Sequence, residues 1–211
     1  MKIEIKKAAK VIAGTEILRN INLDMQSGMI YGLYGPNGSG KTMLMRMIAG
    51  LIYPTSGSIG IDAQQLGKDI DFPPSMGLLI ENSTFLPNYT GFKNLQLLAQ
   101  IRCNISDADI CRTITNVGLF PEDKRKFKKY SLGMKQRLGV AAAIMEHPDL
   151  IILDEPTNAL DTAGINQIVN LLHSEKERGA LIIMSSHNDE ILRSISDSLI
   201  YINNGYAEIK Y

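Results

Sequence analysis

Apolar residues in the first part of the chain follow the spacing of β-strands, with turn-forming residues between the runs. The predicted strands are Ile3–Ile5, Glu16–Met25, Met29–Tyr34, Ser58–Asp62 and Met76–Ile80. Short strands separated by turn residues are typical of antiparallel pairing. We therefore expect an antiparallel β region near the N-terminus.

After about residue 90 the apolar spacing becomes that of helices. Apolar residues recur at intervals of three and four from Gly91 to about Gly118, and a further helical stretch runs from Leu132 to His147, just before Pro148. We expect about residues 90–135 to form a helical subdomain inserted into the β-rich domain.

Strands and helices alternate in the C-terminal part. Leu150–Leu153 is a continuous apolar run, typical of a parallel strand that is covered on both faces. It is followed by the predicted helix Ile165–Arg178, strand Ala180–Ser185, helix Asp189–Ile195 and strand Leu199–Ile202. This order predicts an α/β fold with a mostly parallel sheet, within one domain that covers residues 1–211.

Composition and charge exclude several classes of protein. The 22 Lys and Arg residues balance the 22 Asp and Glu residues, so no overall basic field indicates a nucleic-acid partner. Cys103 and Cys111 lack the spacing of a zinc or CxxC motif, and each is expected in a helix in a reducing compartment. We expect no secretory signal, because residues 1–7 alternate like a strand and lack an apolar region, and no apolar run approaches the roughly 18 residues that span a bilayer. We expect a soluble protein whose membrane role, if any, depends on a partner.

The strongest chemical signal lies between the strand Met29–Tyr34 and a helix-like run, Met43–Gly50. The segment fits G-x-x-x-x-G-K-[ST], the phosphate-binding P-loop, and reads Gly35-Pro36-Asn37-Gly38-Ser39-Gly40-Lys41-Thr42. Glycines let backbone N–H groups curl around a phosphate chain, and the helix adds the positive end of its dipole. Lys41 would reach the β- and γ-phosphates and the Thr42 hydroxyl would bind Mg²⁺. An accidental glycine-rich turn is the alternative, but the strand–loop–helix context favours nucleotide binding.

Asp154 and Glu155 follow the buried strand Leu150–Leu153 directly. Carboxylates at the C-terminal edge of a parallel strand lie beside the place where open α/β sheets bind ligands. Asp154 would hold Mg²⁺, and Glu155 would act as the general base for an attacking water. The alternative is a helix cap followed by an exposed acid, which the P-loop upstream makes less plausible.

His187 follows another predicted strand and would leave the same edge of the sheet. It could donate a hydrogen bond to the γ-phosphate and orient the water. The other histidines have simpler explanations. His147 lies at a predicted helix end, where it could interact with the helix dipole, and His173 lies within a predicted helix with no companion motif.

Ser131 and Gly133 mark the start of the helix predicted from Leu132. Ser131 stands at the N-cap position. Gly133 lies in the first turn, where glycine costs about 1 kcal/mol against alanine and has no evident local stabilising purpose. We expect the glycine to let a phosphate approach the backbone closely, although a simple capped helix would have the same spacing.

The order of these motifs resembles that of an ATP-binding cassette, the nucleotide-binding domain of ABC transporters, over essentially the whole chain. The resemblance rests on the P-loop, the Ser-x-Gly helix start, Asp154-Glu155, Asn158-Ala-Leu-Asp161 and His187. It implies that residues 35–42 are the Walker A loop and that Asp154 and Glu155 end the Walker B strand. Ser131 and Gly133 would belong to the signature motif, Asp161 to the D-loop, and His187 to the switch.

In that family two cassettes enclose two ATP molecules head to tail, each between one P-loop and the partner's signature helix. The resemblance therefore implies a homodimer, or a heterodimer with a second cassette, that binds ATP and Mg²⁺ and closes on ATP. It also implies a separately encoded transmembrane permease, which would dock near Glu81 to Gln100 and hold the chain at the cytoplasmic face of the membrane. The function implied is ATP hydrolysis coupled to transport.

Three positions depart from the family pattern. The signature reads Tyr130-Ser-Leu-Gly-Met134 in place of Leu-Ser-Gly-Gly-Gln, a form that resembles the antibiotic and peptide exporter branch. Glu81 occupies the position of the Q-loop glutamine, where an acid could meet Mg²⁺ or water. The aromatic residue that stacks on adenine is missing, and Val11 or Ile12 stands near its position, so apolar contact would replace stacking.

Two other functions fit parts of the sequence. A cassette that acts on nucleic acid or ribosomes usually has a coiled-coil insertion or a second cassette, and the sequence has neither. A regulatory nucleotide-binding module without turnover would often lack the base, whereas Glu155 is present. The sequence therefore favours an ATPase subunit of an exporter.

Overall fold

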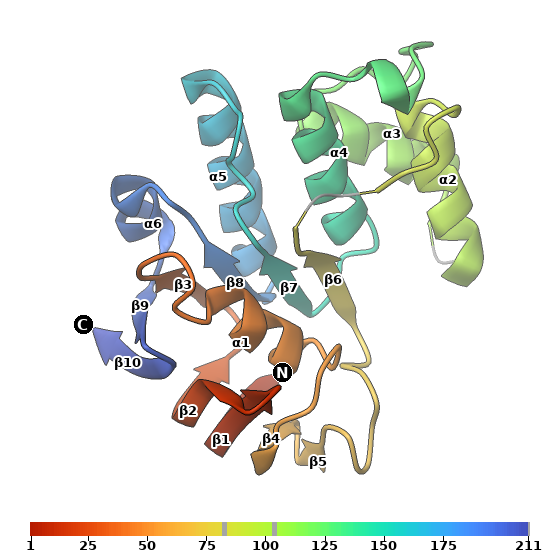
Figure 1. Ribbon diagram of the computed structural model, residues 1–211. Coiled ribbons are helices and arrows are strands. Elements are labelled where there is room, and N and C mark those ends of the chain that lie inside the picture. Colours follow the sequence, from red (N-terminus) through yellow and green to blue (C-terminus); the bar gives the residue numbers. More distant parts are fainter. Residues whose placement is uncertain (82–83, 103–104, 211) are drawn as a thin grey trace.

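A six-stranded sheet forms the centre of the protein in the computed structural model, which describes residues 1–81, 84–102 and 105–210 (Figure 1). Its strand order is β10-β9-β3-β8-β7-β6. All neighbours are parallel except β10, which pairs antiparallel with β9. The strands are β3 (Ile30–Tyr34), β6 (Met76–Leu79), β7 (Leu150–Leu153), β8 (Leu181–Ser185), β9 (Ser198–Asn203) and β10 (Tyr206–Lys210). The predicted mostly parallel sheet is confirmed, but β10 was not predicted.

A four-stranded antiparallel sheet lies beside α1 and has the order β2-β1-β4-β5. Its strands are β1 (Lys2–Ile12), β2 (Thr15–Gln26), β4 (Ser56–Ile61) and β5 (Gln64–Gln65). This confirms the predicted antiparallel region, although β1 is far longer than the predicted strand. The reason is an irregularity after Ile5: Lys7 has a φ of 49° and the pairing register with β2 shifts there. Such a bulge interrupts the alternation from which a strand is recognised.

Helix α1 (Lys41–Ile48) lies between the two sheets, as Figure 1 shows. Its apolar side chains pack in one core with alternate residues of the central strands, such as Leu150 and Ile152 of β7. The intervening residues Ile151 and Leu153 belong to a second core on the opposite face. The strand β7 is thus buried on both faces, as its continuous apolar run predicts.

The remaining helices cover the second face of the central sheet or form a separate helical part. They are α2 (Gly91–Arg102), α3 (Asp107–Asn116), the 3₁₀ turn η1 (Phe127–Lys129), α4 (Leu132–Ile144), α5 (Thr162–Glu177) and α6 (Asp189–Ile195). The helices α2, α3 and α4 lie together in Figure 1, and their apolar side chains share the second core. The helical stretch predicted over 91–118 is therefore two helices, because Ser106 and Asp109 form a capping box that starts α3.

The helix predicted to reach His147 ends at Ile144. His147 has a φ of 51°, a left-handed conformation that cannot continue a helix, and its Nδ1 lies 3.3 Å from Oε1 of Glu175. The His147 side chain therefore faces a carboxylate on α5, while its N–H donates to the carbonyl oxygen of Ile144 at 2.9 Å, at the end of the helix.

Close packing of β6 against α4 gives a testable prediction. A Cβ on Gly77 would lie 1.6 Å from the carbonyl oxygen of Ala143, so Gly77→Ala should destabilise the fold by about 1–3 kcal/mol. Gly60→Ala is the matched control, because the nearest atom to its Cβ would be 3.8 Å away. Its effect should stay within about 0.5 kcal/mol. Chemical unfolding of both variants and the parent measures the difference, and equal stability of the two variants would contradict the packing argument.

Candidate nucleotide-binding site

The P-loop connects β3 to α1 and depends on glycine at two positions. Gly35 has a φ of 141°, and a Cβ there would lie 2.0 Å from the carbonyl oxygen of Ile202. Gly40 is the N-cap of α1 with a φ of 112°, and a Cβ would lie 2.8 Å from Leu18 Cδ2. Both conformations are unfavourable for residues with a side chain. The loop can therefore curl closely over the start of α1 only with glycine at these positions.

Lys41 is the first residue of α1, and its side chain folds back over the loop. The residue is buried, and its Nζ donates hydrogen bonds to the carbonyl oxygens of Gly35 at 2.7 Å and Pro36 at 3.0 Å. The ammonium group thus lies within the curl of the P-loop, where a bound phosphate chain could accept its hydrogen bonds.

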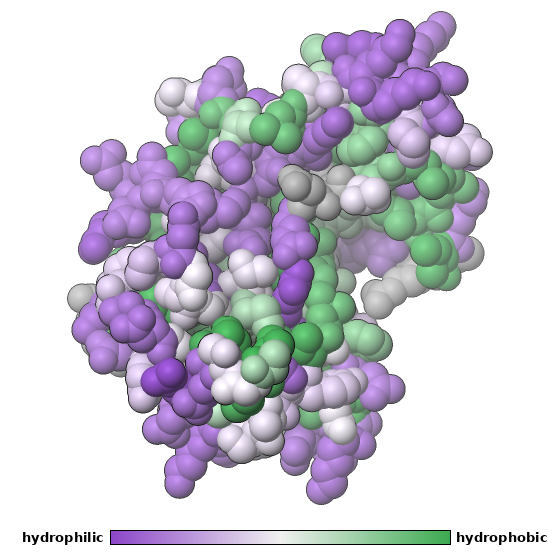
Figure 2. Space-filling model, viewed as in Figure 1, coloured by the Kyte–Doolittle hydropathy of each residue, from purple (hydrophilic) through white to green (hydrophobic). Residues whose placement is uncertain are grey.

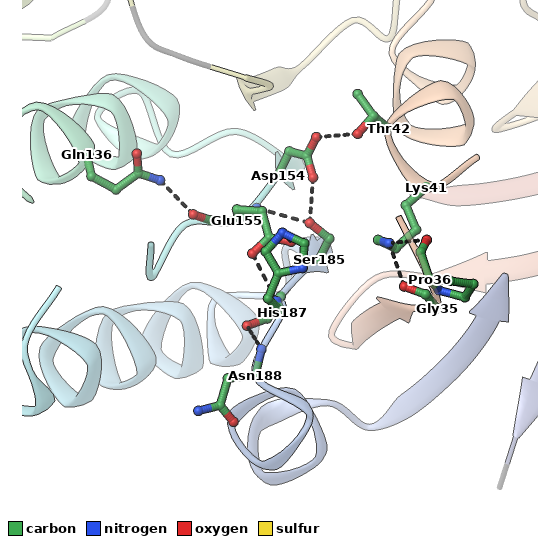
Figure 3. A network of polar contacts seen from close by, with 11 residues as sticks. Gly35, Pro36, Lys41, Thr42, Gln136, Asp154, Glu155, Ser185, His187 and Asn188 are labelled. Carbon is green, nitrogen blue, oxygen red and sulfur yellow. Dashed lines mark hydrogen bonds and ion pairs between the residues drawn. The ribbon is translucent and has the colours of Figure 1, made fainter. Parts of the chain in front are cut away.

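Asp154 joins the P-loop helix to two neighbouring strand ends, as Figure 3 shows. Its Oδ2 accepts a hydrogen bond of 2.6 Å from Thr42 Oγ1, and its Oδ1 accepts one of 2.5 Å from Ser185 Oγ. A hydroxyl oxygen and a carboxylate oxygen therefore lie side by side at the start of α1. These are the oxygen ligands that Mg²⁺ prefers, so this pair of side chains fits a magnesium ion.

Glu155 has an unusual backbone conformation that hydrogen bonds hold in place. Its φ is 56°, and its N–H donates to Ser185 Oγ at 3.0 Å. Its carbonyl oxygen accepts hydrogen bonds from Gln136 Nε2 at 2.7 Å and from the Asn158 N–H at 3.1 Å. The carboxylate accepts a hydrogen bond from the His187 N–H at 3.0 Å, and His187 Nε2 lies 3.4 Å from its Oε1. These contacts fix the direction of the carboxylate.

The surroundings of Glu155 also change its acidity. Burial is the largest effect and raises the pKa of the Glu155 carboxyl above its ordinary value. The hydrogen bond from the His187 N–H and the charges of His187 and Lys41 oppose the rise, whereas Asp154 adds to it. A carboxylate whose pKa is raised accepts a proton more readily, as a general base must.

Most of the predicted site residues come together around one cavity of about 260 Å³. Asp154, Glu155 and His187 line it together with part of the P-loop. Ile17 and Met43 also line it, and the sequence did not predict them. The P-loop residues in the lining are Asn37, Gly38, Ser39, Gly40, Lys41 and Thr42. Ile17 lies on β2, and only its position in the folded sheet brings it to the cavity. The cavity is thus lined by the expected polyphosphate-binding groups together with two apolar side chains.

Glu81 and Val11 do not line this cavity. Glu81 is exposed, with a φ of 60°, and its Oε1 lies 2.5 Å from Nη2 of Arg46 on α1. The following residue, Asn82, lies outside the described part of the chain. Val11 is 39% exposed near the end of β1, and its N–H donates to Thr55 Oγ1 at 3.1 Å. Glu81 or Val11 could contact a nucleotide bound in this cavity only if the residue moved or the nucleotide extended beyond the cavity.

The signature residues lie away from the cavity, at the exposed start of α4. Ser131 is the N-cap of this helix, and its Oγ accepts a hydrogen bond of 3.2 Å from the Met134 N–H. The expectation that Gly133 has no local purpose is wrong, because a Cβ there would lie 2.8 Å from the carbonyl oxygen of Ala159. Glycine at this position thus allows α4 to pack closely against the segment before α5.

Asp161 lies outside the cavity as well and caps α5. Its Oδ1 accepts a hydrogen bond of 3.0 Å from the Gly164 N–H, and Nη2 of Arg137 lies 3.6 Å away.

Of the cysteines, Cys111 is a free thiol on α3, whereas Cys103 lies outside the described residues.

Comparison with known proteins identifies this arrangement. The family model described as "ABC transporter" matches residues 18–158. The uncharacterized ABC transporter ATP-binding protein YybJ of Bacillus subtilis is 50% identical over 98% of this chain and 94% of its own length. The bacitracin transport ATP-binding protein BcrA of Enterococcus faecalis is 40% identical over 97% of this chain and 67% of its own length.

A similar fold is found in the dimeric structure of MJ0796, a bacterial ABC transporter cassette. Its TM-score is 0.87 at 24% sequence identity, over 98% of this chain and 96% of that one. The fold agreement covers the helical part as well as the two sheets, and the family match spans the P-loop, the signature helix and the Asp154-Glu155 strand end. The chain therefore belongs to the ABC transporter family, as one of its ATP-binding and ATP-hydrolysing subunits.

Proposed function

We propose that the chain binds MgATP, dimerises on it and hydrolyses it to drive export of an antibiotic or peptide through a separate membrane permease. The observation that carries the proposal is the cavity in which the P-loop, Asp154, Glu155 and His187 meet. The signature of the form Tyr130–Met134 and the 40% identity to a bacitracin transport protein support the export of such a substrate.

Each residue of the cavity has a proposed role in the reaction. The P-loop N–H groups and Lys41 bind the phosphate chain, and Glu155 accepts the proton of the attacking water. His187 donates a hydrogen bond to the γ-phosphate and orients the water. Thr42 and Asp154 would hold Mg²⁺, with Glu81 as a further ligand once its ion pair with Arg46 opens. The ion supplies positive charge that stabilises the oxygens of the transferred phosphoryl group.

The signature and D-loop residues, which lie outside the cavity, are assigned to the partner's nucleotide. Ser131, Gly133 and Asp161 would face ATP bound by the P-loop of a second copy, or of a second cassette in a heterodimer. The dimeric state of the MJ0796 structure supports this assignment, as does the exposed start of α4. A helix N-terminus attracts anions through its free N–H groups and dipole. Val11, together with Ile17, is assigned apolar contact with the adenine.

Attachment to the membrane is assigned to a permease. Within the part of the chain that the structure describes, none of the helices is both long and apolar enough to cross a bilayer. Figure 2 shows apolar residues at the surface over α2, and exposed ones there and just before it are Leu86, Leu98 and Ile101. Leu86 and Leu98 fall in the proposed docking region, Glu81 to Gln100, and Ile101 follows it directly within the helical subdomain of about residues 90–135. The permease would hold the chain at the cytoplasmic face of the membrane.

Glu155→Gln tests the base. Turnover of ATP should fall about 10²-fold or more, because an amide cannot accept the proton of the attacking water. Binding of ATP and ATP-dependent dimerisation should persist, since the amide oxygen can still accept the His187 N–H bond. Phosphate release and size-exclusion chromatography measure the two properties. Glu177→Gln, an exposed change at the end of α5, is the control. Parent-like turnover in Glu155→Gln would refute the assignment.

Lys41→Ala tests the P-loop. Removing a buried ammonium group that would hydrogen-bond to the phosphates should weaken ATP binding at least about tenfold by calorimetry. Lys68→Ala removes an exposed lysine of the same charge and should leave the affinity unchanged. An unaltered Kd in Lys41→Ala would count against the site.

Mixing two inactive variants tests the shared site. In a head-to-tail dimer, one Lys41→Ala chain and one Ser131→Arg chain form one intact site, made from Lys41 of the second and Ser131 of the first. With random pairing, half of the dimers carry one intact site, so the mixture should recover ATPase activity up to about a quarter of the parent value. Each variant alone should remain inactive. No recovery in dimers shown to exchange subunits would contradict a composite site.

A further inference from the structure

One side chain joins the signature helix to the backbone of the proposed base. Gln136 lies on α4, a turn and a half after the N-cap Ser131, and its Nε2 donates the 2.7 Å hydrogen bond to the carbonyl oxygen of Glu155. Figure 3 shows this side chain reaching from α4 to the strand end that carries Asp154 and Glu155. The contact links two segments that belong to different parts of the fold, the helical part and the central sheet.

The hydrogen bond from Gln136 acts on a backbone conformation of Glu155 that is unfavourable without surrounding contacts. A φ of 56° is unfavourable for a residue with a side chain, and such a conformation persists only when surrounding contacts hold it. Ser185 and Asn158 hold Glu155 from the central sheet and from the segment after it. Gln136 holds it from α4. Because the carboxylate follows the backbone, a shift of α4 would alter its direction.

The start of α4 is itself fixed to its surroundings beside Gln136. Nη1 of Arg137 donates to the Val117 carbonyl at 2.6 Å and to Gln167 Oε1 at 2.9 Å. Two glycines leave room for this guanidinium, since a Cβ on Gly118 or Gly164 would lie 2.3 or 2.2 Å from its nitrogens. Arg137 thus links the first turns of α4 to the end of α3 and to α5, so these segments would move together and carry Gln136 with them.

We propose that Gln136 is a positioning residue that couples nucleotide held at the start of α4 to the orientation of Glu155. The inference rests on the proposed function, in which Ser131 and Gly133 meet the ATP of the partner's P-loop. ATP in one site of the dimer then sets the base of the other site through α4 and Gln136. Hydrolysis at each site is therefore faster when both sites are occupied, and the rate rises cooperatively with ATP concentration.

The test compares two substitutions of Gln136 in the full chain. Gln136→Met keeps the length of the side chain but removes the donor, whereas Gln136→Lys restores a donor of similar reach. Lys135→Met is the matched control, because Lys135 lies next on α4 and its Nζ lies over the Phe127 ring, away from Glu155. ATPase rates measured over a range of ATP concentrations give kcat, KM and the Hill coefficient for each variant and the parent.

In Gln136→Met, kcat should fall about tenfold with KM within about twofold of the parent, because the base is misdirected while ATP binding is intact. The Hill coefficient should fall from above one to near one. Gln136→Lys should recover most of kcat, and Lys135→Met should match the parent. In a Glu155→Gln background, Gln136→Met should leave ATP-dependent dimerisation unchanged.

Parent-like kcat and Hill coefficient in Gln136→Met would overturn the inference, and so would a parent chain that hydrolyses ATP with a Hill coefficient of one. A loss that Gln136→Lys does not reverse, accompanied by a lower unfolding temperature, would also overturn it, because the residue would then serve the fold alone. A parent chain that binds no ATP would overturn the proposed function, and the inference with it. The parent measurement therefore separates the two failures.

Discussion

The carboxylate of Asp154 holds the site together, because it is the point where three separate segments meet. One oxygen accepts from Thr42 at the start of α1, and the other accepts from Ser185 at the end of β8. The Asp154 N–H also donates to the Leu79 carbonyl at the end of β6, at 2.6 Å. Asp154, at the end of β7, thus connects the P-loop helix to the ends of β6 and β8. Parallel pairing makes this possible, because it brings the carboxyl ends of β6, β7 and β8 to one edge of the sheet.

Several residues at this edge have left-handed backbone conformations. Gly35, Gly40, Glu81 and Glu155 all have positive φ angles, and the two glutamates adopt them with a side chain. Such conformations are costly, so they are stable only where packing and hydrogen bonds determine them fully. At Glu155 four hydrogen bonds to the residue do so, through its N–H, carbonyl and carboxylate. These hydrogen bonds also fix the direction of the Glu155 carboxylate, which a general base needs.

Much of the fold could be predicted because its strongest signals are local. The strand β7 follows from its continuous apolar run, and the P-loop from its glycines between a strand and a helix. The strand β10 was missed, although Asn204 and Gly205, both with positive φ, form the kind of turn that joins hairpin strands. The Asn204-Gly205 pair is itself a hairpin signal in the sequence.

Other features depend on contacts between distant residues, and no local pattern reveals them. Ile17 reaches the cavity only because β2 packs beside α1. Gly133 is explained by the carbonyl of Ala159, which the fold brings within 2.8 Å of where a Cβ would be. The ion pair of Glu81 with Arg46 likewise joins residues far apart in the chain. Sequence motifs therefore indicated most of the residues that line the candidate site, whereas the contacts that hold them in place are seen only in the folded structure.

The charges of the cavity favour the proposed site in which a second copy of the chain contributes to triphosphate binding. Among the described residues that line it, Asp154 and Glu155 carry negative charge and Lys41 carries positive charge. A polyphosphate that enters adds several negative charges close to both carboxylates, a repulsion that one ammonium group cannot balance. The P-loop N–H groups and the dipole of α1 would supply part of the compensation, and Mg²⁺ held by Thr42 and Asp154 would supply more. In the proposed dimer the remainder comes from the start of the partner's α4, where the capped helix presents N–H groups toward solvent. ATP thereby stabilises the dimer, and hydrolysis, which removes the γ-phosphate charge from between the two surfaces, weakens it.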